Sequence, residues 1–200
     1  MILKFRKIGQ KVSALIIALL LGCTLFAQEK YELSEESTMK VTGTSTLHDW
    51  EVVSNKVSGG LLFEMKGKAK KNQPLKGSII ESNLSLKVES LKSERGETMN
   101  GKMHRALLYD EFPEIKFQMS EAISVNEDNT IARGILTIAG KAKSVEIEVT
   151  LKASEDIISV QGSKDVKLGD FEIDPPTAMF GQIETGNDIV ISFDLTYLKE

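Results

Sequence analysis

The sequence predicts an all-β fold of antiparallel strands with one helical insertion, and three observations support this. From Tyr31 onward, apolar and polar residues alternate in short runs, the period-two pattern of strands with one buried and one exposed face. Turn-forming residues separate these runs at the spacing of β-hairpins. One segment, 93–108, repeats its apolar residues at helical spacing instead. The chain therefore predicts one domain of about eight strands, either a sandwich or a closed barrel.

The N-terminal segment has the layout of a secretory signal peptide. Four basic residues precede an apolar run over 14–26, which is followed by small and polar residues. This run is shorter than the ~20 residues that a bilayer-spanning helix needs. We therefore expect residues 1–27 to be a signal peptide cleaved near Ala27. The domain at 28–200 is then periplasmic or secreted.

A lipoprotein is the alternative for this segment. Residues 20–23 resemble a bacterial lipobox, in which Cys23 is lipidated and becomes the new N-terminus. Leu21 is bulkier than usual for such a motif, and 24–27 continue the apolar run. We therefore prefer ordinary cleavage. Cys23 is the sole cysteine, so the mature chain has no disulfide framework.

The charge balance excludes one class of partner. Without the four basic residues of 1–27, the chain keeps 21 Lys and Arg against 29 Asp and Glu, a formal charge of −8. Nucleic-acid binding needs a basic surface, so we expect no nucleic-acid partner.

The strand pattern is clearest at 145–151 and 189–197, where every second residue is apolar over the whole run. Weaker runs lie at 39–41, 48–52, 84–88 and 115–119. The turn residues between runs lie at 54–55, 72–74, 126–129, 140–141 and 154–156.

The helical segment carries Met99, Met103 and Leu107 at intervals of four residues. Gly96 and Gly101 weaken a helix by roughly 1 kcal/mol each, so we expect it to depend on docking its methionine stripe against the strands. The alternative is a mobile lid over a cavity mouth, which these glycines would loosen.

The sequence indicates no catalytic or metal site. The histidines are His48 and His104, and without mature cysteines the usual His/Cys zinc spacings are absent. The segment 43–47 begins like a hydrolase nucleophile elbow but lacks its closing glycine. We therefore expect no enzyme. The alternative is an enzyme on a hydrophobic substrate with either histidine as general base.

Several segments together resemble a known family, and they occur in its order and spacing. They are 43–50, 103–107, 112–117, 134–143, 168–176 and 186–189. From about Tyr31 to its end, the chain resembles the YceI-like family of exported bacterial lipid-binding barrels. The resemblance implies an eight-stranded lipocalin-like barrel, an apolar tunnel for a polyisoprenoid chain and no enzymatic activity. The chain departs from the family at 100–102, where relatives often carry an acidic residue ahead of the histidine.

The expected function is that of an exported protein that sequesters or carries a polyisoprenoid or similar amphiphilic lipid. Each buried CH₂ of such a ligand contributes roughly 0.8 kcal/mol. By strand alternation, the candidate tunnel residues are Trp50, Phe63, Leu84, Leu86, Phe117, Met119, Ile147, Val149, Ile191 and Phe193.

Other expectations concern cofactors and partners. We expect no cofactor besides the bound lipid, and transient contact with a membrane. The oligomeric state stays open and includes a homodimer. The alternative function is a filled barrel without ligand that acts through its surface as an envelope stress or interaction protein.

Overall fold

The structure is a computed structural model that describes residues 28–66, 75–126 and 128–200. The expected signal peptide, the lipobox and the turn at 72–74 lie outside the described residues.

The described chain consists mainly of β-strands. They are β1 (Gln28–Leu33), β2 (Thr38–Ser45), β3 (Trp50–Ser54), β4 (Val57–Met65), β5 (Gly77–Lys87), β6 (Glu114–Ser124), β7 (Asn129–Ile138), β8 (Lys141–Ala153), β9 (Ile157–Lys167), β10 (Thr177–Ala178) and β11 (Ile183–Lys199). The helices are α2 (Glu97–Ala106) and the short 3-10 helices η1 (Val88–Ser90) and η2 (Leu168–Phe171). No helix in the described part of the chain is long and apolar enough to span a membrane.

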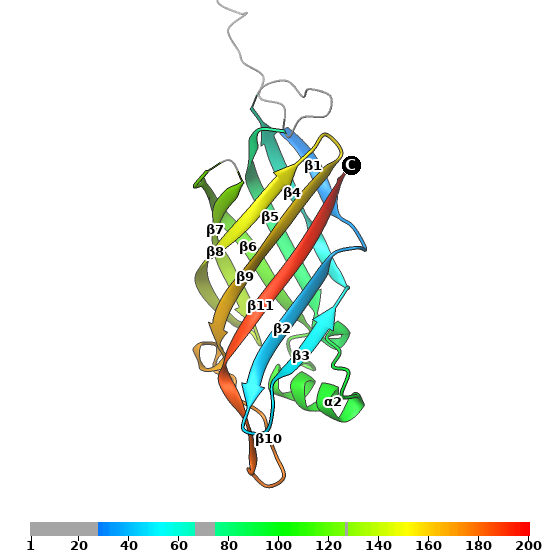
Figure 1. The fold of residues 1–200 in the computed structure, drawn as a ribbon, viewed down its shortest axis with the longest axis vertical. Helices are drawn as coiled ribbons and strands as arrows, with labels where there is room; N and C mark the ends of the chain where they lie inside the picture. The colour runs from blue at the N-terminus through cyan, green and yellow to red at the C-terminus, as the bar shows by residue number, and fades with distance from the viewer. Residues whose placement is uncertain (1–27, 67–74, 127) are drawn as a thin grey trace, which may run out of the picture.

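The strands form a closed barrel (Figure 1). The hydrogen-bonded order is β1-β4-β5-β6-β7-β8-β9-β11, and β11 pairs back to β1. All these pairings are antiparallel. The predicted eight-stranded antiparallel barrel is therefore confirmed, and the sandwich is not formed. Closure removes most of the free sheet edge, and the ladders satisfy the backbone groups of the paired residues.

The first two positions in the barrel wall are each formed by two strands with a break between them. The 17-residue β11 pairs with β1 near one end and with β2 near the other, so β1 and β2 share one position in the barrel wall. At their junction the buried Ser37 hydroxyl donates to the Thr196 carbonyl (3.2 Å) and accepts from the Thr196 amide (3.1 Å). The side chain thus replaces ladder bonds where the strand breaks.

The second interruption lies between β3 and β4, which occupy the next position in the wall. β2 pairs with β3 and β1 pairs with β4, and two residues separate β3 from β4. β3 also forms an isolated β-bridge with the segment after η1, through Val53 and Lys92. Figure 1 shows α2 and β10 at the same end, opposite the C-terminus.

The helix α2 is shorter than the expected 93–108. Gly96 precedes it with a φ of 87°, which a side chain disfavours, and Leu108 follows its last turn with a φ of 51°. The segment before the helix is held from within, because the buried Asn100 Oδ1 accepts a hydrogen bond from the Ser93 amide (2.8 Å). Packing of Ala106, Leu107 and Met103 against the barrel core agrees with the expected docked helix.

Candidate functional site

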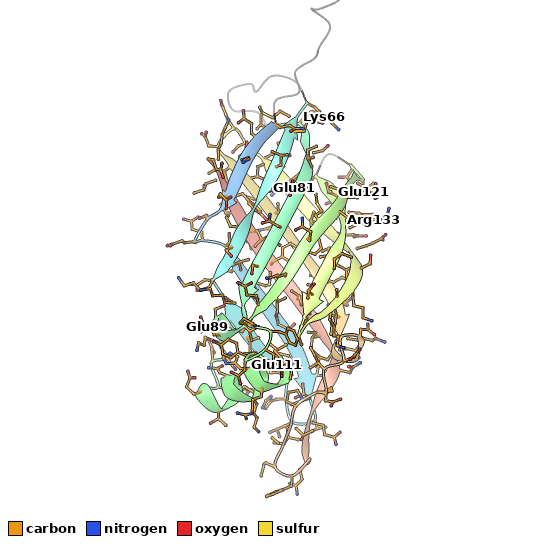
Figure 2. The ribbon with its side chains drawn as sticks, turned by 180° about the vertical axis from the view of Figure 1, so that it is seen from behind. Lys66, Glu81, Glu89, Glu111, Glu121 and Arg133 are labelled. Atoms are coloured by element: carbon orange, nitrogen blue, oxygen red, sulfur yellow. The ribbon has the colours of Figure 1, made fainter. Side chains whose placement is uncertain are left out.

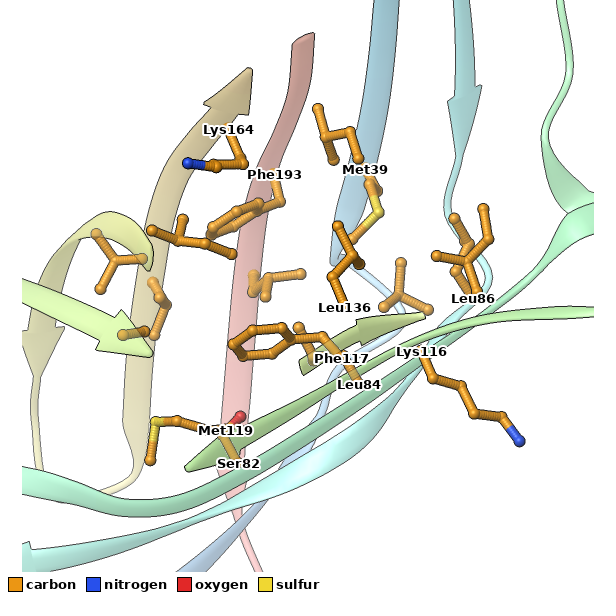
Figure 3. Close-up of a pocket in the computed structure, with 18 of the residues that line it drawn as sticks. Met39, Ser82, Leu84, Leu86, Lys116, Phe117, Met119, Leu136, Lys164 and Phe193 are labelled. Carbon is orange, nitrogen blue, oxygen red and sulfur yellow. The ribbon is translucent and has the colours of Figure 1, made fainter. Parts of the chain in front are cut away.

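The barrel interior contains two adjoining cavities. The first, here called the barrel cavity, has a volume of about 80 Å³ and lies within the strands (Figure 3). The second, the end cavity, has a volume of about 230 Å³ and lies between α2, β2, β3 and the β10–β11 hairpin. Ile115 and Ile191 line both, so the two cavities meet at these side chains.

The structure brings most of the predicted site residues together. The barrel cavity is lined by Leu84, Leu86, Phe117, Met119, Ile147, Val149, Ile191 and Phe193. Trp50 lines the end cavity. Phe63 is not among the described residues that line either cavity. It is fully buried in the core, where its ring packs edge-on against Tyr31 at 6.4 Å between centroids.

Three aromatic rings of the two cavities lie over glycines of the strand beside them. The pairs are Trp50 over Gly43, Phe117 over Gly134 and Phe193 over Gly162. A Cβ atom at Gly43 would stand 2.3 Å from Cζ2 of the indole, closer than side chains allow. The missing Cβ therefore lets each ring lie against the wall, which keeps apolar space in the interior.

The barrel cavity holds a few polar groups among apolar side chains. Tyr197 is 2% exposed and shares a hydrogen bond with Ser82. Burial raises the pKa of the Tyr197 hydroxyl to about 12, and the Ser82 hydroxyl opposes this shift by stabilising the phenolate. Tyr197 is therefore neutral and can hydrogen-bond a ligand without bringing a charge into the interior.

Lys164 also lines the barrel cavity, although it was not among the site residues predicted from the sequence. Every second residue of β9 faces the barrel interior, and Lys164 belongs to this set. The set is Ile158, Val160, Gly162, Lys164 and Val166. Small and polar residues in the middle of β9 make this alternation weak, so no strand was expected there.

The end cavity is closed on one side by α2. Met99, Met103 and Ala106 on one helix face line it, opposite Ala178 and Ile183 of the β10–β11 hairpin. The basic side chains of His48, Arg95 and Lys102 also line it, and no acidic residue does so among those described. The cavity is thus apolar with polar and basic groups among its lining residues.

Neither histidine is arranged as part of a catalytic pair in the described structure. His48 Nδ1 lies 3.0 Å from the Asp49 carbonyl oxygen. His104 Nε2 lies 3.4 Å from the Leu91 carbonyl oxygen and its ring stacks near Tyr109. His48 precedes β3, which begins at Trp50 rather than at residue 48. Among the described residues no group of three or more His, Cys, Asp or Glu side chains could hold a metal.

An apolar tip projects beside the end cavity. It consists of Met179 and Phe180 in the β10–β11 hairpin and Leu47 in the β2–β3 turn, with exposed fractions of 65%, 107% and 65%. Three hydrogen bonds of Thr46 join the turn to the hairpin. Its amide donates to the Glu184 carbonyl, and its hydroxyl donates to the Gln182 carbonyl and accepts from the Glu184 amide. The tip therefore forms one surface at the barrel end that carries the larger cavity.

The outer wall of the barrel carries charged side chains. Figure 2 shows Glu121 and Arg133 on the outer face of neighbouring strands, far from the helical end. Arg133 pairs with Glu121 (3.2 Å) and with Glu146 (2.6 Å) across three strands. All three side chains are solvent-exposed, so we assign them to the solvated wall rather than to a site.

Comparisons with known proteins agree with this architecture. The sequence matches the family model of the YceI-like domain over residues 29–197. The comparison with curated proteins gives no significant match.

Solved structures show the same fold. Burkholderia cenocepacia BcnA has 19% sequence identity and a TM-score of 0.63, with 82% of this chain and 98% of that chain covered. A polyisoprenoid binding domain from Saccharophagus degradans, implicated in plant cell wall breakdown, has 15% identity and a TM-score of 0.62, with 85% and 98% covered. The Campylobacter jejuni YCEI protein has 17% identity and a TM-score of 0.51, with 68% and 85% covered. At these identities the likeness concerns the fold alone.

Proposed function

The chain belongs to the YceI-like family, and from that premise we propose that it binds a polyisoprenoid or similar amphiphilic lipid inside its barrel. The observation that carries the proposal is the pair of adjoining apolar cavities. For comparison, an apolar cavity of about 150 Å³ takes up benzene. The end cavity exceeds this volume, and the barrel cavity continues it toward the centre of the barrel. The polyisoprenoid binding domain of similar fold supports the choice of lipid.

The side chains that line the interior suit a flexible apolar chain better than a compact ligand. Its lining is mainly aliphatic, and the methionines on α2 can adapt to a chain of varying course. A chain longer than the cavities would displace these adaptable side chains first. We propose no enzymatic role and no cofactor beyond the bound lipid.

We also propose that the protein is exported and acts in the cell envelope. The signal-like layout of residues 1–27 supports cleavage near Ala27, with lipidation at Cys23 as the alternative. The apolar tip supports transient contact with a membrane, because Leu47, Met179 and Phe180 expose apolar area beside the cavity that would receive the lipid. Such contact would let a poorly soluble lipid enter without crossing water.

Native mass spectrometry tests the lipid-binding proposal. The protein is purified without detergent from a bacterial envelope, its mass is measured, and the bound material is extracted into organic solvent. We expect a stoichiometric, releasable isoprenoid adduct. A ligand-free mass that persists after incubation with polyprenyl lipids would instead favour a filled barrel that acts through its surface. The same spectrum gives the mature N-terminus, near Gln28 or at a lipidated Cys23.

A further inference from the structure

Lys164 occupies an inward-facing position of the barrel, where most side chains are apolar. It lies on the inward face of β9 between Gly162 and Val166, and it pairs in register with Ile191 of β11. It lines the barrel cavity together with Phe193 and Ile147. The interior of the barrel therefore contains a cationic side chain surrounded mainly by apolar ones.

A second lysine of the same cavity shows the contrast. Lys116 is also among the lining residues, but it lies on the outer face of β6 and its ammonium group stands 2.9 Å from Glu114 Oε2. In Figure 3 the Lys116 side chain leads away from the apolar side chains, whereas that of Lys164 lies with them beside Phe193. None of the ion pairs formed among the described residues includes Lys164.

The strand pairing beside Lys164 explains how the protein tolerates this charge without a bound ligand. The β8–β9 ladder runs from Ala153↔Ile158 to Val149↔Gly162, and within these two fully described strands no pairing continues to Lys164. Lys164 is half-buried at this place, so its ammonium group keeps part of its hydration. An anion is therefore not required while the cavity holds no lipid.

A ligand that fills the cavity changes this balance. It displaces water next to Lys164, and a neutral ligand would leave the ammonium group without a partner in apolar surroundings, which is costly. An anionic group would instead form a charge-assisted hydrogen bond with it. No acidic residue lines either cavity in the described part of the chain, so the lining itself supplies no competing carboxylate.

We propose that Lys164 binds the anionic group, a phosphate or carboxylate, of an amphiphilic lipid. The head group of the lipid then lies beside Lys164 at the level of Ile191, where the barrel cavity meets the end cavity, and its chain fills the apolar space of the two cavities. This inference rests on the proposed function and adds to it the class of lipid and the place of its head group.

The test compares two lipids that share the same isoprenoid chain and differ in their head group. Geranylgeranyl phosphate, geranylgeraniol and inorganic phosphate are titrated into the lipid-stripped protein and its Lys164→Met variant. The fluorescence of Trp50, the single tryptophan, reports occupancy of the end cavity. We expect the variant to lose about tenfold or more in affinity for the phosphate ester and to keep its affinity for the alcohol. Lys164→Arg should retain the preference for the phosphate ester.

The matched control is Lys167→Met, which should change neither affinity, because Lys167 is exposed at the end of the same strand and lines neither cavity. Equal losses for both lipids, or no loss for the phosphate ester, would overturn the role of Lys164 while lipid binding stands. Inorganic phosphate binding as tightly as the ester would make this a free-anion site and overturn the head-group assignment. If the parent protein binds neither lipid, the proposed function itself fails.

Discussion

Trp50 lies over Gly43 of the neighbouring strand, and this pair shapes one wall of the end cavity. A methyl group at residue 43 would stand 2.3 Å from the indole Cζ2, so Gly43→Ala should push the ring toward the cavity. We expect a loss of about 1–3 kcal/mol in the free energy of unfolding, typical of overpacking, together with weaker lipid binding. Urea denaturation and the emission spectrum of Trp50 measure both effects.

A double-mutant cycle isolates this contact. Trp50→Phe removes the indole atoms nearest to residue 43, so Gly43→Ala should cost less stability in that background than in the parent protein. Strictly additive costs would show that the glycine is required by the backbone rather than by the ring.

Tyr197 makes the stability of the protein depend on alkaline pH. Burial raises the pKa of its hydroxyl to about 12, against about 10 in an unfolded chain. The folded state holds this proton more tightly, so the contribution is complete below pH 10 and is lost as pH rises toward 12. We expect the free energy of unfolding to fall by about 1.4 kcal/mol per pH unit in that window from this group alone.

Urea denaturation between pH 8 and 12 checks the Tyr197 prediction against Tyr197→Phe. The variant loses the hydrogen bond with Ser82 and starts from a different stability, so the slopes are compared and not the absolute values. Burial also raises the pKa of Tyr31, which leaves part of the slope in the variant. Parallel curves for both proteins would contradict the prediction.

Alternation in the sequence predicts the face of a side chain but not its depth along the barrel. Phe63 faces inward as expected, yet it lies at the level of Tyr31, where side chains fill the interior. Eight of the ten predicted residues line the barrel cavity. Lys164 was missed because Gly162 and Ser163 weaken the apolar pattern of its strand.

The helix α2 depends on its two glycines in opposite ways. At Gly101 an added Cβ would meet Arg105 Nη1 at an ordinary 3.6 Å, so Gly101→Ala should raise the free energy of unfolding by about 0.5–1 kcal/mol. At Gly96 the φ of 87° disfavours any side chain, so Gly96→Ala should lower it by about 1 kcal/mol. Chemical denaturation of both variants checks the signs.

The rate of lipid uptake by the Gly101→Ala variant also distinguishes the two interpretations of α2, a docked packing helix and a mobile lid. A docked packing helix predicts an unchanged rate of lipid uptake in stopped-flow fluorescence. A lid that must deform to admit lipid predicts slower uptake, because the variant stiffens the helix. A destabilised Gly101→Ala protein would contradict the assigned helix position altogether.

The interrupted strands were the part of the fold that the sequence did not predict. The breaks at Ser37 and between β3 and β4 rest on side-chain hydrogen bonds to distant segments, which local patterns do not contain. The short β10 likewise depends on pairing with the extension of β11 beyond the expected run 189–197. Of these features, β10 lies at the helical end, where Ala178 lines the end cavity.

At the scale of the whole molecule, the strand count was predicted from the spacing of turn residues, although the apolar alternation did not mark every strand and β9 was not expected. Antiparallel connections close the wall in chain order, so neighbouring wall positions follow one another along the chain. The turn at 140 illustrates this, since Ala139 and Gly140 both have positive φ and join β7 to β8 directly. The cavities could not be predicted, because they depend on how side chains from all strands pack together.

The two ends of the barrel differ, and the difference predicts how the molecule approaches a membrane. The apolar tip lies at the helical end, while residues 28–200 carry a formal charge of −8 that opposes attraction to anionic lipid. We therefore expect weak, salt-insensitive binding to neutral phosphatidylcholine vesicles. Phe180→Ser should weaken it about tenfold or more, because burying a phenyl group contributes about 1.5–3 kcal/mol.

Vesicle co-sedimentation measures this binding, with Ile135→Ser as the matched control, because Ile135 is exposed on β7 in the outer wall. Phe180 is fully exposed, so its replacement should leave the free energy of unfolding unchanged and any loss of binding can be assigned to the tip. An equal loss in Ile135→Ser would mean that vesicles contact the barrel wall instead. Unchanged binding in Phe180→Ser would remove the tip from lipid delivery, and the end cavity would then have to fill from solution.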